Sequence, residues 1–254
     1  MKFLTFPFLL LLIFLPAHAR ANGCTLIVAY PAGQTLKETG DCAQQQSPAS
    51  SFKLPLALMG YDAGILSDEH KPAWPFVEGY LVNKPDDKQT TDPTSWEKNS
   101  VVWYSQKITT DMGMEKFQHY VDQFQYGNRN LSGNEGQNDG LTQAWLKSSL
   151  TISPREQVAF VKAMLDRKLG VSDKAYDMTK AIIPAFEGKG GWAVKGKTGS
   201  VPAPGKTGWF VGWAEKGGKT IIFAKLLQPH DTSEGPGGPM ARDLFLEELS
   251  GLTF

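Results

Sequence analysis

The chain has 254 residues, of which 41% are hydrophobic and 20% are charged. This composition is typical of a globular protein with a sizeable core, and it excludes a disordered or fibrous chain. The 26 basic and 26 acidic side chains give a formal net charge of zero, which argues against a protein that binds nucleic acid or an anionic membrane surface.

The N-terminus has the pattern of a secretory signal. Lys2 precedes an apolar run over residues 3–15, and small residues at alternate positions follow it, ending at Ala19 and Ala21. The run is too short to span a bilayer comfortably. We therefore expect cleavage after Ala19 or Ala21 and a mature protein that works in the periplasm without a membrane contact. The expected parts of the chain are a signal peptide at 1–21 and a single folded domain at 22–254.

Both cysteines of the chain lie close to the predicted cleavage site. Export would place Cys24 and Cys42 in an oxidising compartment, where disulfides form and persist. They flank a predicted hairpin, because residues 24–30 are apolar and rich in strand-forming side chains, and residues 31–33 supply a turn. A bond between them requires a suitable register of the strands. We expect a disulfide, with two unpaired thiols as the alternative.

The rest of the chain predicts helices between two groups of strands. A capping box at 153–156 opens an amphipathic helix in the middle of the chain. Strands from both ends with a helical insert between them indicate an α+β fold, an α/β/α sandwich in which helices flank a central antiparallel sheet beside a helical lobe. The expected elements are a helix at 51–66, a mainly helical section at 94–186, strands at 192–198, 208–215 and 220–227, and a helix at 240–249.

Several common hydrolase signals do not occur in the sequence, namely G-x-S-x-G, H-E-x-x-H and C-x-x-C. The histidines of the mature chain are His70, His119 and His230, and their spacing is not that of metal ligands. We expect them at the surface and expect no metal. An enzyme with this sequence would therefore need a base other than histidine.

A serine and a lysine stand one helical turn apart at Ser50 and Lys53. Residues i and i+3 share a helix face, so Lys53 can reach the Ser50 hydroxyl. Serine becomes a good nucleophile only when a base takes its proton, and a lysine can do this once burial disfavours its charge. The apolar residues 54–59 favour such burial. Ser95 and Lys98 have the same spacing in a polar surround, and we prefer the first pair.

A Lys-Thr-Gly triplet at 197–199 ends a predicted strand. There the lysine and threonine can bind a substrate carboxylate, and the glycine lets a substrate approach the backbone. A second copy at 206–208 follows a proline-containing turn, and we prefer the first because residues 192–197 lead into it as a strand. Residues 191–198 also match a nucleotide-binding P-loop expression. That interpretation is rejected because a proline-rich turn, and no helix, follows the match.

Taken in order, these motifs resemble those of the class D β-lactamases, the oxacillinase-type members of the penicillin-recognising serine hydrolases. The elements are Ser50-x-x-Lys53, Ser100-Val101-Val102, Tyr126-Gly127-Asn128 and Lys197-Thr198-Gly199, with further matching segments at 145–146, 208–213 and Arg242. The first and last elements are shared with class A enzymes and penicillin-binding proteins, whereas the element at 126–128 points to class D. The resemblance covers the mature chain. It implies a β-lactamase/transpeptidase-like fold and hydrolysis of β-lactam antibiotics, which confers resistance.

The resemblance also implies roles in the reaction. Ser50 would attack the lactam carbonyl. Lys53, carboxylated on its side-chain nitrogen by CO₂, would be the base for acylation and deacylation, with an unmodified lysine as the alternative. Ser100 would carry a proton to the leaving nitrogen. The backbone N–H groups of Ser50 and Ser200 would form the oxyanion hole.

Other residues would shape the pocket. Val102 and Trp145 would border the modified lysine, with the indole N–H of Trp145 donating to the carbamate. Apart from CO₂ no cofactor is expected. The expected partners are small-molecule β-lactams and, as a possibility, a second copy of the chain in a homodimer.

The expected substrate-binding residues come from several segments of the chain. Lys197, Thr198 and Arg242 would hold the substrate carboxylate, and the rest of this set is Val102, Tyr126, Asn128, Gly199 and Ser200. Without the resemblance, we would expect Trp145 to be a packing residue and residues 126–128 to form a turn. Arg242 would be expected to be a solvated charge on a helix. The short turn at 200–205 leaves the side-chain selectivity of the pocket open.

Two other functions fit part of the pattern. A β-lactam sensor domain resembles class D closely but stays acylated, and it is usually tethered to a membrane helix. A D-alanyl-D-alanine peptidase or transpeptidase usually has S-x-N where this chain has Tyr-Gly-Asn at 126–128. Turnover of a β-lactam separates both from a β-lactamase.

Overall fold

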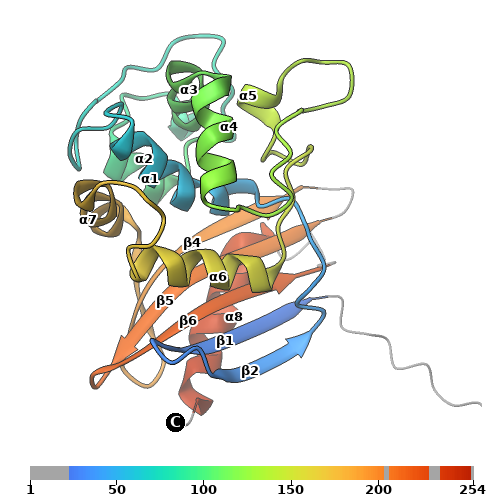
Figure 1. Cartoon of the computed structure of the whole chain (residues 1–254), viewed down its shortest axis with the longest axis vertical. Coiled ribbons are helices and arrows are strands. Elements are labelled where there is room, and N and C mark those ends of the chain that lie inside the picture. The colour runs from blue at the N-terminus through green and yellow to red at the C-terminus, as the bar shows by residue number, and fades with distance from the viewer. Residues whose placement is uncertain (1–22, 203–205, 229–234, 253–254) are drawn as a thin grey trace, which may run out of the picture.

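The computed structural model describes residues 23–202, 206–228 and 235–252, and the predicted signal peptide lies outside them. In this part of the chain, six strands form one sheet in the order β2-β1-β6-β5-β4-β3, and every neighbouring pair is antiparallel (Figure 1). The strands are β1 (Cys24–Tyr30), β2 (Thr35–Gly40), β3 (Ala185–Gly188), β4 (Trp192–Val201), β5 (Thr207–Lys216) and β6 (Lys219–Leu227). Pairing of β1 with β6 joins the two ends of the chain in one sheet.

Helices cover both faces of this sheet. The C-terminal helix α8 packs on β4, β5 and β6, whereas α6 packs on β1, β5 and β6 from the other side. A helical lobe, made of α1 to α5 and α7, stands above one end of the sheet (Figure 1). The helices are α1 (Lys53–Asp62), α2 (Pro93–Asn99), α3 (Val102–Met112), α4 (Met114–Gln123), α5 (Gly140–Gln143), α6 (Pro154–Leu165), α7 (Asp173–Ile182) and α8 (Gly237–Glu248), with short 3₁₀ helices η1 (Ala49–Phe52), η2 (Pro85–Asp87) and η4 (Leu249–Gly251). The predicted α/β/α sandwich with a helical lobe is confirmed.

The two faces of the sheet build two cores, because successive side chains of a strand point to opposite sides. On β5, Trp209, Val211 and Trp213 belong to the core shared with the helical lobe and α6. Phe210 lies in the other core, under α8. There Phe223 of β6 stacks on Phe245 of α8, with ring centroids 3.9 Å apart. A fully buried Phe contributes about 1.5–3 kcal/mol, so these rings hold α8 on the sheet.

The predicted helix at 51–66 was wrong at both ends. The chain forms the 3₁₀ turn η1 first, and α1 then ends at Asp62. Gly64 has φ +74°, a left-handed conformation that favours glycine and ends helices. The backbone N–H groups of Ile65 and Leu66 turn back to the carbonyl of Gly60 at 3.0 and 2.9 Å. Leu66 is buried by this turn and not by a helix face, which is why its apolar character was misleading.

Three other boundaries differ from the prediction. The edge strand β3 lies at the end of the section expected to be helical, and its partner is β4. Strand β4 runs on to Val201, and α8 begins at Gly237 and not near residue 240. Glycines make this start hard to predict, because they are poor helix formers.

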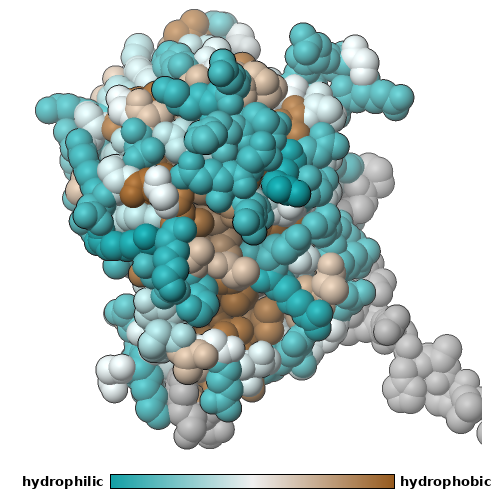
Figure 2. Space-filling view, in the orientation of Figure 1, coloured by the Kyte–Doolittle hydropathy of each residue, from teal (hydrophilic) through white to brown (hydrophobic). Residues whose placement is uncertain are grey.

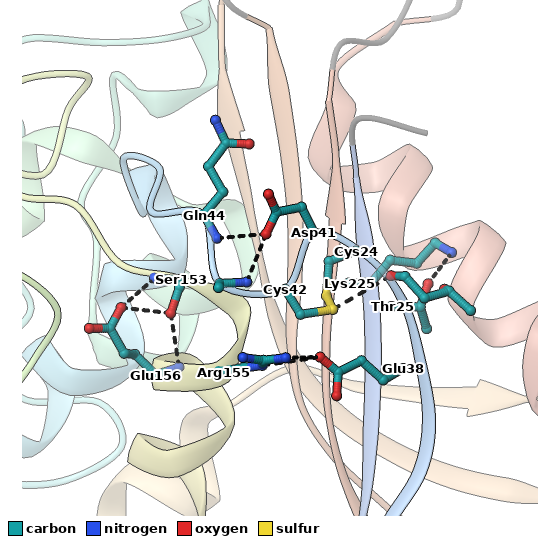
Figure 3. Close-up of a disulfide and its surroundings, with 12 residues drawn as sticks. Cys24, Thr25, Glu38, Asp41, Cys42, Gln44, Ser153, Arg155, Glu156 and Lys225 are labelled. Atoms are coloured by element: carbon teal, nitrogen blue, oxygen red, sulfur yellow. Dashed lines mark hydrogen bonds and ion pairs between the residues drawn. A yellow bond between two sulfur atoms is a disulfide. The ribbon is translucent and has the colours of Figure 1, made fainter. Parts of the chain in front are cut away.

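The N-terminal hairpin is tied to its surroundings by a covalent and several polar contacts. A disulfide joins Cys24, the first residue of β1, to Cys42, two residues beyond β2, with the Cα atoms 5.1 Å apart (Figure 3). Arg155 of α6 donates to Glu38 of β2 at 2.6 Å. Lys225 of β6 donates to the Thr25 hydroxyl at 3.0 Å. The edge of the sheet is therefore held to both α6 and the neighbouring strands.

Hydrophilic residues cover most of the face seen in Figure 2, and apolar side chains gather in a strip over the sheet, below the helical lobe. No helix within the described ranges is both long and apolar enough to cross a membrane.

Candidate active site

Ser50 and Lys53 come together at the junction of η1 and α1. The Lys53 ammonium nitrogen lies 3.2 Å from the Ser50 hydroxyl oxygen. Ala49, the residue before the serine, has φ +47°, which is strained for a residue with a side chain. Such strain is kept only where the surroundings enforce it, and it is common at active sites. Here it presents Ser50, which is partly exposed, next to a buried lysine.

Burial makes Lys53 a usable base. Its side chain is 1% exposed at the first position of α1. Loss of solvent, followed by the nearby charge of Lys197, lowers the pKa of Lys53 to about 7, while Glu97 and Asp87 act in the opposite direction. An amine with this pKa is neutral for a large part of the time near neutral pH. It can then accept a proton, which an ammonium group cannot do.

Ser100 and Lys197 form a second serine–lysine pair. Ser100 is the C-terminal cap of α2 and has φ 61°, a left-handed conformation. The Lys197 ammonium donates to the Ser100 hydroxyl at 3.1 Å and to the Thr198 carbonyl at 3.2 Å. Lys197 is 2% exposed, and burial lowers its pKa to about 8 although Glu97 raises it. The structure thus places Lys197 against Ser100, where its charge orients the hydroxyl.

Both serines open onto one cavity of about 590 Å³. Its lining also contains the last four residues of β4, the proline that follows them, and residues just before and at the start of α8. The lining residues are Ser50, Asn83, Ser100, Thr198, Gly199, Ser200, Val201, Pro202, Gly235, Pro236, Gly237 and Pro239. This places two serine hydroxyls and the end of a strand around a space large enough for a small molecule.

Gly199 sets the close approach of β4 to η1. A Cβ at this position would lie 2.6 Å from the Pro48 carbonyl oxygen and 3.3 Å from the Ser50 nitrogen. Only a glycine lets the strand and the nucleophile turn come this near. The next residue, Ser200, accepts a hydrogen bond on its hydroxyl from the Gly238 N–H at 2.9 Å, which fixes β4 to the start of α8.

Trp145 and Val102 are buried in the lobe close to these groups. The Trp145 ring stacks on Phe52, the residue before Lys53, with centroids 5.4 Å apart. Among the described residues its indole N–H has no hydrogen-bond partner, although it is fully buried. Val102 is 2% exposed at the first position of α3, which packs on α1. A buried, unpaired donor near Lys53 is suited to an anionic group on that lysine.

Besides Lys197 and Val102, three predicted substrate-binding residues are not among those that line the Ser50 cavity. Tyr126 is fully buried, where its hydroxyl meets Gln157 at 3.3 Å and its ring packs on Phe52. Asn128 donates to the Ser149 carbonyl at 2.8 Å. Arg242 lines a neighbouring cavity and donates to Asp243 at 2.8 Å. Their roles toward a substrate stay predictions, and the first two residues make contacts that support the lobe.

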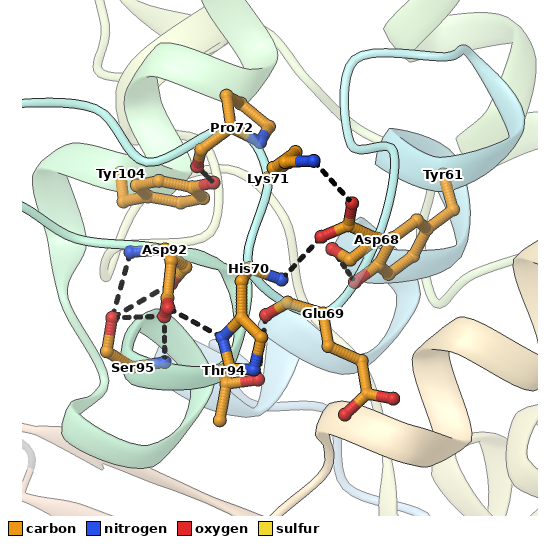
Figure 4. A network of polar contacts seen from close by, with 10 residues as sticks. All are labelled: Tyr61, Asp68, Glu69, His70, Lys71, Pro72, Asp92, Thr94, Ser95 and Tyr104. Carbon is orange, nitrogen blue, oxygen red and sulfur yellow. Dashed lines mark hydrogen bonds and ion pairs between the residues drawn. The ribbon is translucent and has the colours of Figure 1, made fainter.

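The alternative Ser-x-x-Lys motif, at Ser95 and Lys98, supports the start of α2. Ser95 lies in the first turn of α2, where its hydroxyl and backbone N–H both bond to the Asp92 side chain, at 2.6 and 2.7 Å, in a capping box (Figure 4). His70 meets the same carboxylate at 2.8 Å. Lys98 is exposed. These contacts anchor the start of α2, and the end of that helix carries Ser100.

The sequence motifs did not identify Glu97 as a site residue. It is buried with no exposed side chain, and burial raises its pKa to about 7 while Lys197 and Lys53 lower it. A single acidic residue in a short polar helix gives no sign of burial. Among the described residues, no group of three or more His, Cys, Asp and Glu side chains could hold a metal ion.

Comparison with known proteins gives three close matches and a family. Residues 23–246 match the penicillin binding protein transpeptidase domain. The chain is 46% identical to Beta-lactamase OXA-9 of Klebsiella pneumoniae over 89% of this chain and 86% of that protein. It is 32% identical to Beta-lactamase OXA-1 of Escherichia coli over 84% and 78%. It superposes on the crystal structure of the OXA-427 class D β-lactamase with a TM-score of 0.82 and 43% identity, covering 91% and 100%.

Proposed function

Because this chain belongs to the class D β-lactamases, we propose that it hydrolyses β-lactam antibiotics through an acyl-enzyme on Ser50. The observation that carries the proposal is the Ser50 hydroxyl 3.2 Å from the nitrogen of a buried lysine, at the edge of a cavity of about 590 Å³. A nucleophile with its base in hydrogen-bond reach is the arrangement that acyl transfer needs.

Carboxylation of Lys53 by CO₂ completes the site in this proposal. A neutral amine adds CO₂ reversibly, and the product supplies an anionic base beside Ser50. Burying an anion is costly unless it is hydrogen-bonded. The unpaired indole N–H of Trp145 supports this fit, since it is a donor with no other partner among the described residues. Loss of solvent lowers the pKa of Lys53 to about 7, so the reactive neutral amine is available near neutral pH.

The steps then follow from the positions of the side chains. Ser50 loses its proton to Lys53 and attacks the lactam carbonyl. The backbone N–H groups of Ser50 and Ser200 face the developing oxyanion. Ser100, oriented by Lys197 at 3.1 Å, gives a proton to the lactam nitrogen as the ring C–N bond breaks, and the proton that Lys53 took from Ser50 replaces it on Ser100. Lys53, now free of that proton, takes one from a water molecule, whose oxygen attacks the acyl carbonyl. The ester bond then breaks, and the proton on Lys53 returns to the Ser50 oxygen.

The proposal extends to the place of work and the assembly. We infer a periplasmic enzyme, released by cleavage after Ala19 or Ala21, with no metal requirement and with β-lactams as its small-molecule substrates. Assembly into a homodimer remains a prediction from the family resemblance.

Turnover of nitrocefin by the purified protein tests the function. We expect many turnovers per enzyme, stimulation by bicarbonate after CO₂ is removed, and loss of turnover in Ser50→Ala with an unchanged melting temperature. Ser51→Ala serves as the control, because Ser51 bonds to Pro48 and Gln157 and not to Lys53. One equivalent of stable acylation without turnover would favour a β-lactam sensor, and D-alanyl-D-alanine cleavage without β-lactam turnover would favour a peptidase.

A further inference from the structure

The carboxylate of Glu97 is buried near the two lysines of the site without a hydrogen-bond partner. It lies on α2, three residues before Ser100, with none of its side chain exposed. Within the described ranges neither of its oxygens accepts a hydrogen bond. Buried polar groups are nearly always paired, so this one needs a physical explanation. An apolar side chain at the same place would avoid the cost of desolvation, which indicates that the acid serves another purpose.

Of the cationic side chains that share a cavity with Glu97, one is suited to be its electrostatic partner. This cavity, of about 530 Å³, is lined by Glu97 together with the cations Lys98, Lys195, Lys197 and Arg242. Lys195 donates to the Lys180 carbonyl at 2.6 Å, and Arg242 donates to Asp243. Lys98 is exposed to solvent. Lys197 is the buried cation of the set, and its hydrogen bonds go to neutral oxygens of Ser100 and Thr198.

Other titratable groups nearby already have partners of their own. Lys53 faces the pair from α1 and meets Ser50. Asp87 of η2 accepts from the Asn83 N–H at 3.3 Å and lies 4.0 Å from Lys84. Tyr61 of α1 donates to the Asp68 carbonyl at 3.1 Å. Helix α7 contributes the apolar residues 181–182 to the cavity. Glu97 is therefore the buried anion that balances Lys197.

We propose that Glu97 is a positioning residue, whose carboxylate keeps the charge on Lys197 and thereby fixes Ser100 as the proton donor to the leaving nitrogen. The inference rests on the proposed acyl-serine function. A charged Lys197 has only hydrogens to offer, so the Ser100 oxygen accepts from it and the hydroxyl hydrogen is directed elsewhere. A neutral Lys197 could instead accept that hydrogen, and Ser100 would lose its orientation.

Burial raises the pKa of Glu97 to about 7 while Lys197 and Lys53 lower it, so the carboxylate carries its charge above about pH 7, where Lys197 must keep its own. Burial lowers the pKa of Lys197 and the Glu97 carboxylate raises it. Burial and Lys197 lower the pKa of Lys53, and Glu97 raises that as well. Removing the carboxylate charge should therefore lower the pKa of both lysines. The acid limb of the pH profile, set by Lys53, and the alkaline limb, set by Lys197, should move in the same direction.

The test is the pH dependence of nitrocefin kcat/KM for Glu97→Gln at saturating bicarbonate. Glutamine keeps the size of the side chain and removes the charge. The alkaline limb should move to lower pH by about one to two units, the size expected for unit charges several ångströms apart at an effective dielectric near 20. The acid limb should move in the same direction by less, because burial raises the pKa of Glu97 to about 7 and the carboxyl is partly protonated there. Glu97→Asp keeps the charge and should keep both limbs in place. Glu69→Gln removes an exposed acid of the same lobe and should leave the profile unchanged.

A second measurement does not depend on activity. In protein labelled with ¹³C-lysine, the titration of Lys197 should move to lower pH in Glu97→Gln. A fall in rate with both limbs and the Lys197 titration unmoved would overturn the positioning role and show a packing role only. A wild-type protein that does not turn over nitrocefin would instead refute the proposed function. If Glu97→Gln does not fold, the ¹³C carboxyl signal of Glu97 in the wild type decides, because a carboxyl protonated across the active pH range overturns the inference.

Discussion

Replacing Gly199 by alanine should separate Ser50, the proposed nucleophile, from the strand that would complete the proposed oxyanion hole. The added Cβ would lie 2.6 Å from the Pro48 carbonyl oxygen, 2.9 Å from the Ser51 nitrogen and 3.3 Å from the Ser50 nitrogen. All three are backbone atoms, in η1 or directly before it, so no side-chain rotation can relieve the overlap. Ordinary contacts begin roughly 0.5–1 Å further out, so β4 and η1 must move apart by about that amount.

A displacement of this size has a large effect on rate and a moderate one on stability. Misplacement of reacting groups by about 1 Å can cost on the order of 100-fold, and we expect kcat/KM for nitrocefin to fall by roughly that factor. Overpacking typically costs about 1–3 kcal/mol of unfolding free energy, which urea denaturation would measure. Gly251→Ala is the matched control, since no atom lies within 4 Å of its Cβ position. A Gly199→Ala enzyme within threefold of wild type would refute the reasoning.

Three further predictions concern the base and the fold. Trp145→Phe keeps the stacking on Phe52 but removes the indole N–H that would donate to the carbamate. A hydrogen bond to a charged group contributes about 1.5–3 kcal/mol, so half-maximal activity should need roughly ten- to a hundredfold more bicarbonate. An unchanged bicarbonate requirement would contradict the proposed contact between Trp145 and the carbamate. The pKa of Lys53 is lowered by burial to about 7, so kcat/KM should fall as pH drops below 7 and the lysine becomes an ammonium, and a profile that is flat down to pH 5 would argue against Lys53 as the base. Replacing both Cys24 and Cys42 by serine opens a loop closed over a sequence separation of 18. The unfolding free energy, measured by denaturation, should fall by about 3 kcal/mol, and kcat should change little. Equal stability would show that the disulfide does not form in solution.

Local sequence patterns predicted the parts of the structure that depend on short-range rules. The capping box at Ser153 and Glu156 begins α6 as expected. Apolar runs separated by turns rich in glycine and proline predicted the three C-terminal strands, and the spacing of Ser50 and Lys53 predicted their contact, which the structure has at 3.2 Å. These features depend on the periodicity of helices and strands, which can be recognised from residues that are close together in the sequence.

Long-range contacts decided what the sequence could not predict. Glu97 is buried where α2, α7 and β4 come together, and none of these contacts is local. The hydrogen bonds of Lys197 go to Ser100 and Thr198, contacts that the motif alone did not predict, and its expected role toward the substrate carboxylate stays a prediction. Tyr126 packs its ring on Phe52, and its expected role toward the substrate stays a prediction. A sequence motif indicates which residue types a site contains. The packing of elements that are distant in the sequence determines which of those residues reach the cavity.

The most direct test of the account is to locate the covalent intermediate. The protein is mixed with a slowly hydrolysed β-lactam, quenched in acid and digested, and the acylated peptide is sequenced by mass spectrometry. The account predicts an adduct with the full mass of the β-lactam on Ser50, and none in Ser50→Ala. An adduct on Ser95 or Ser100, or turnover with no covalent adduct at any time after mixing, would contradict it.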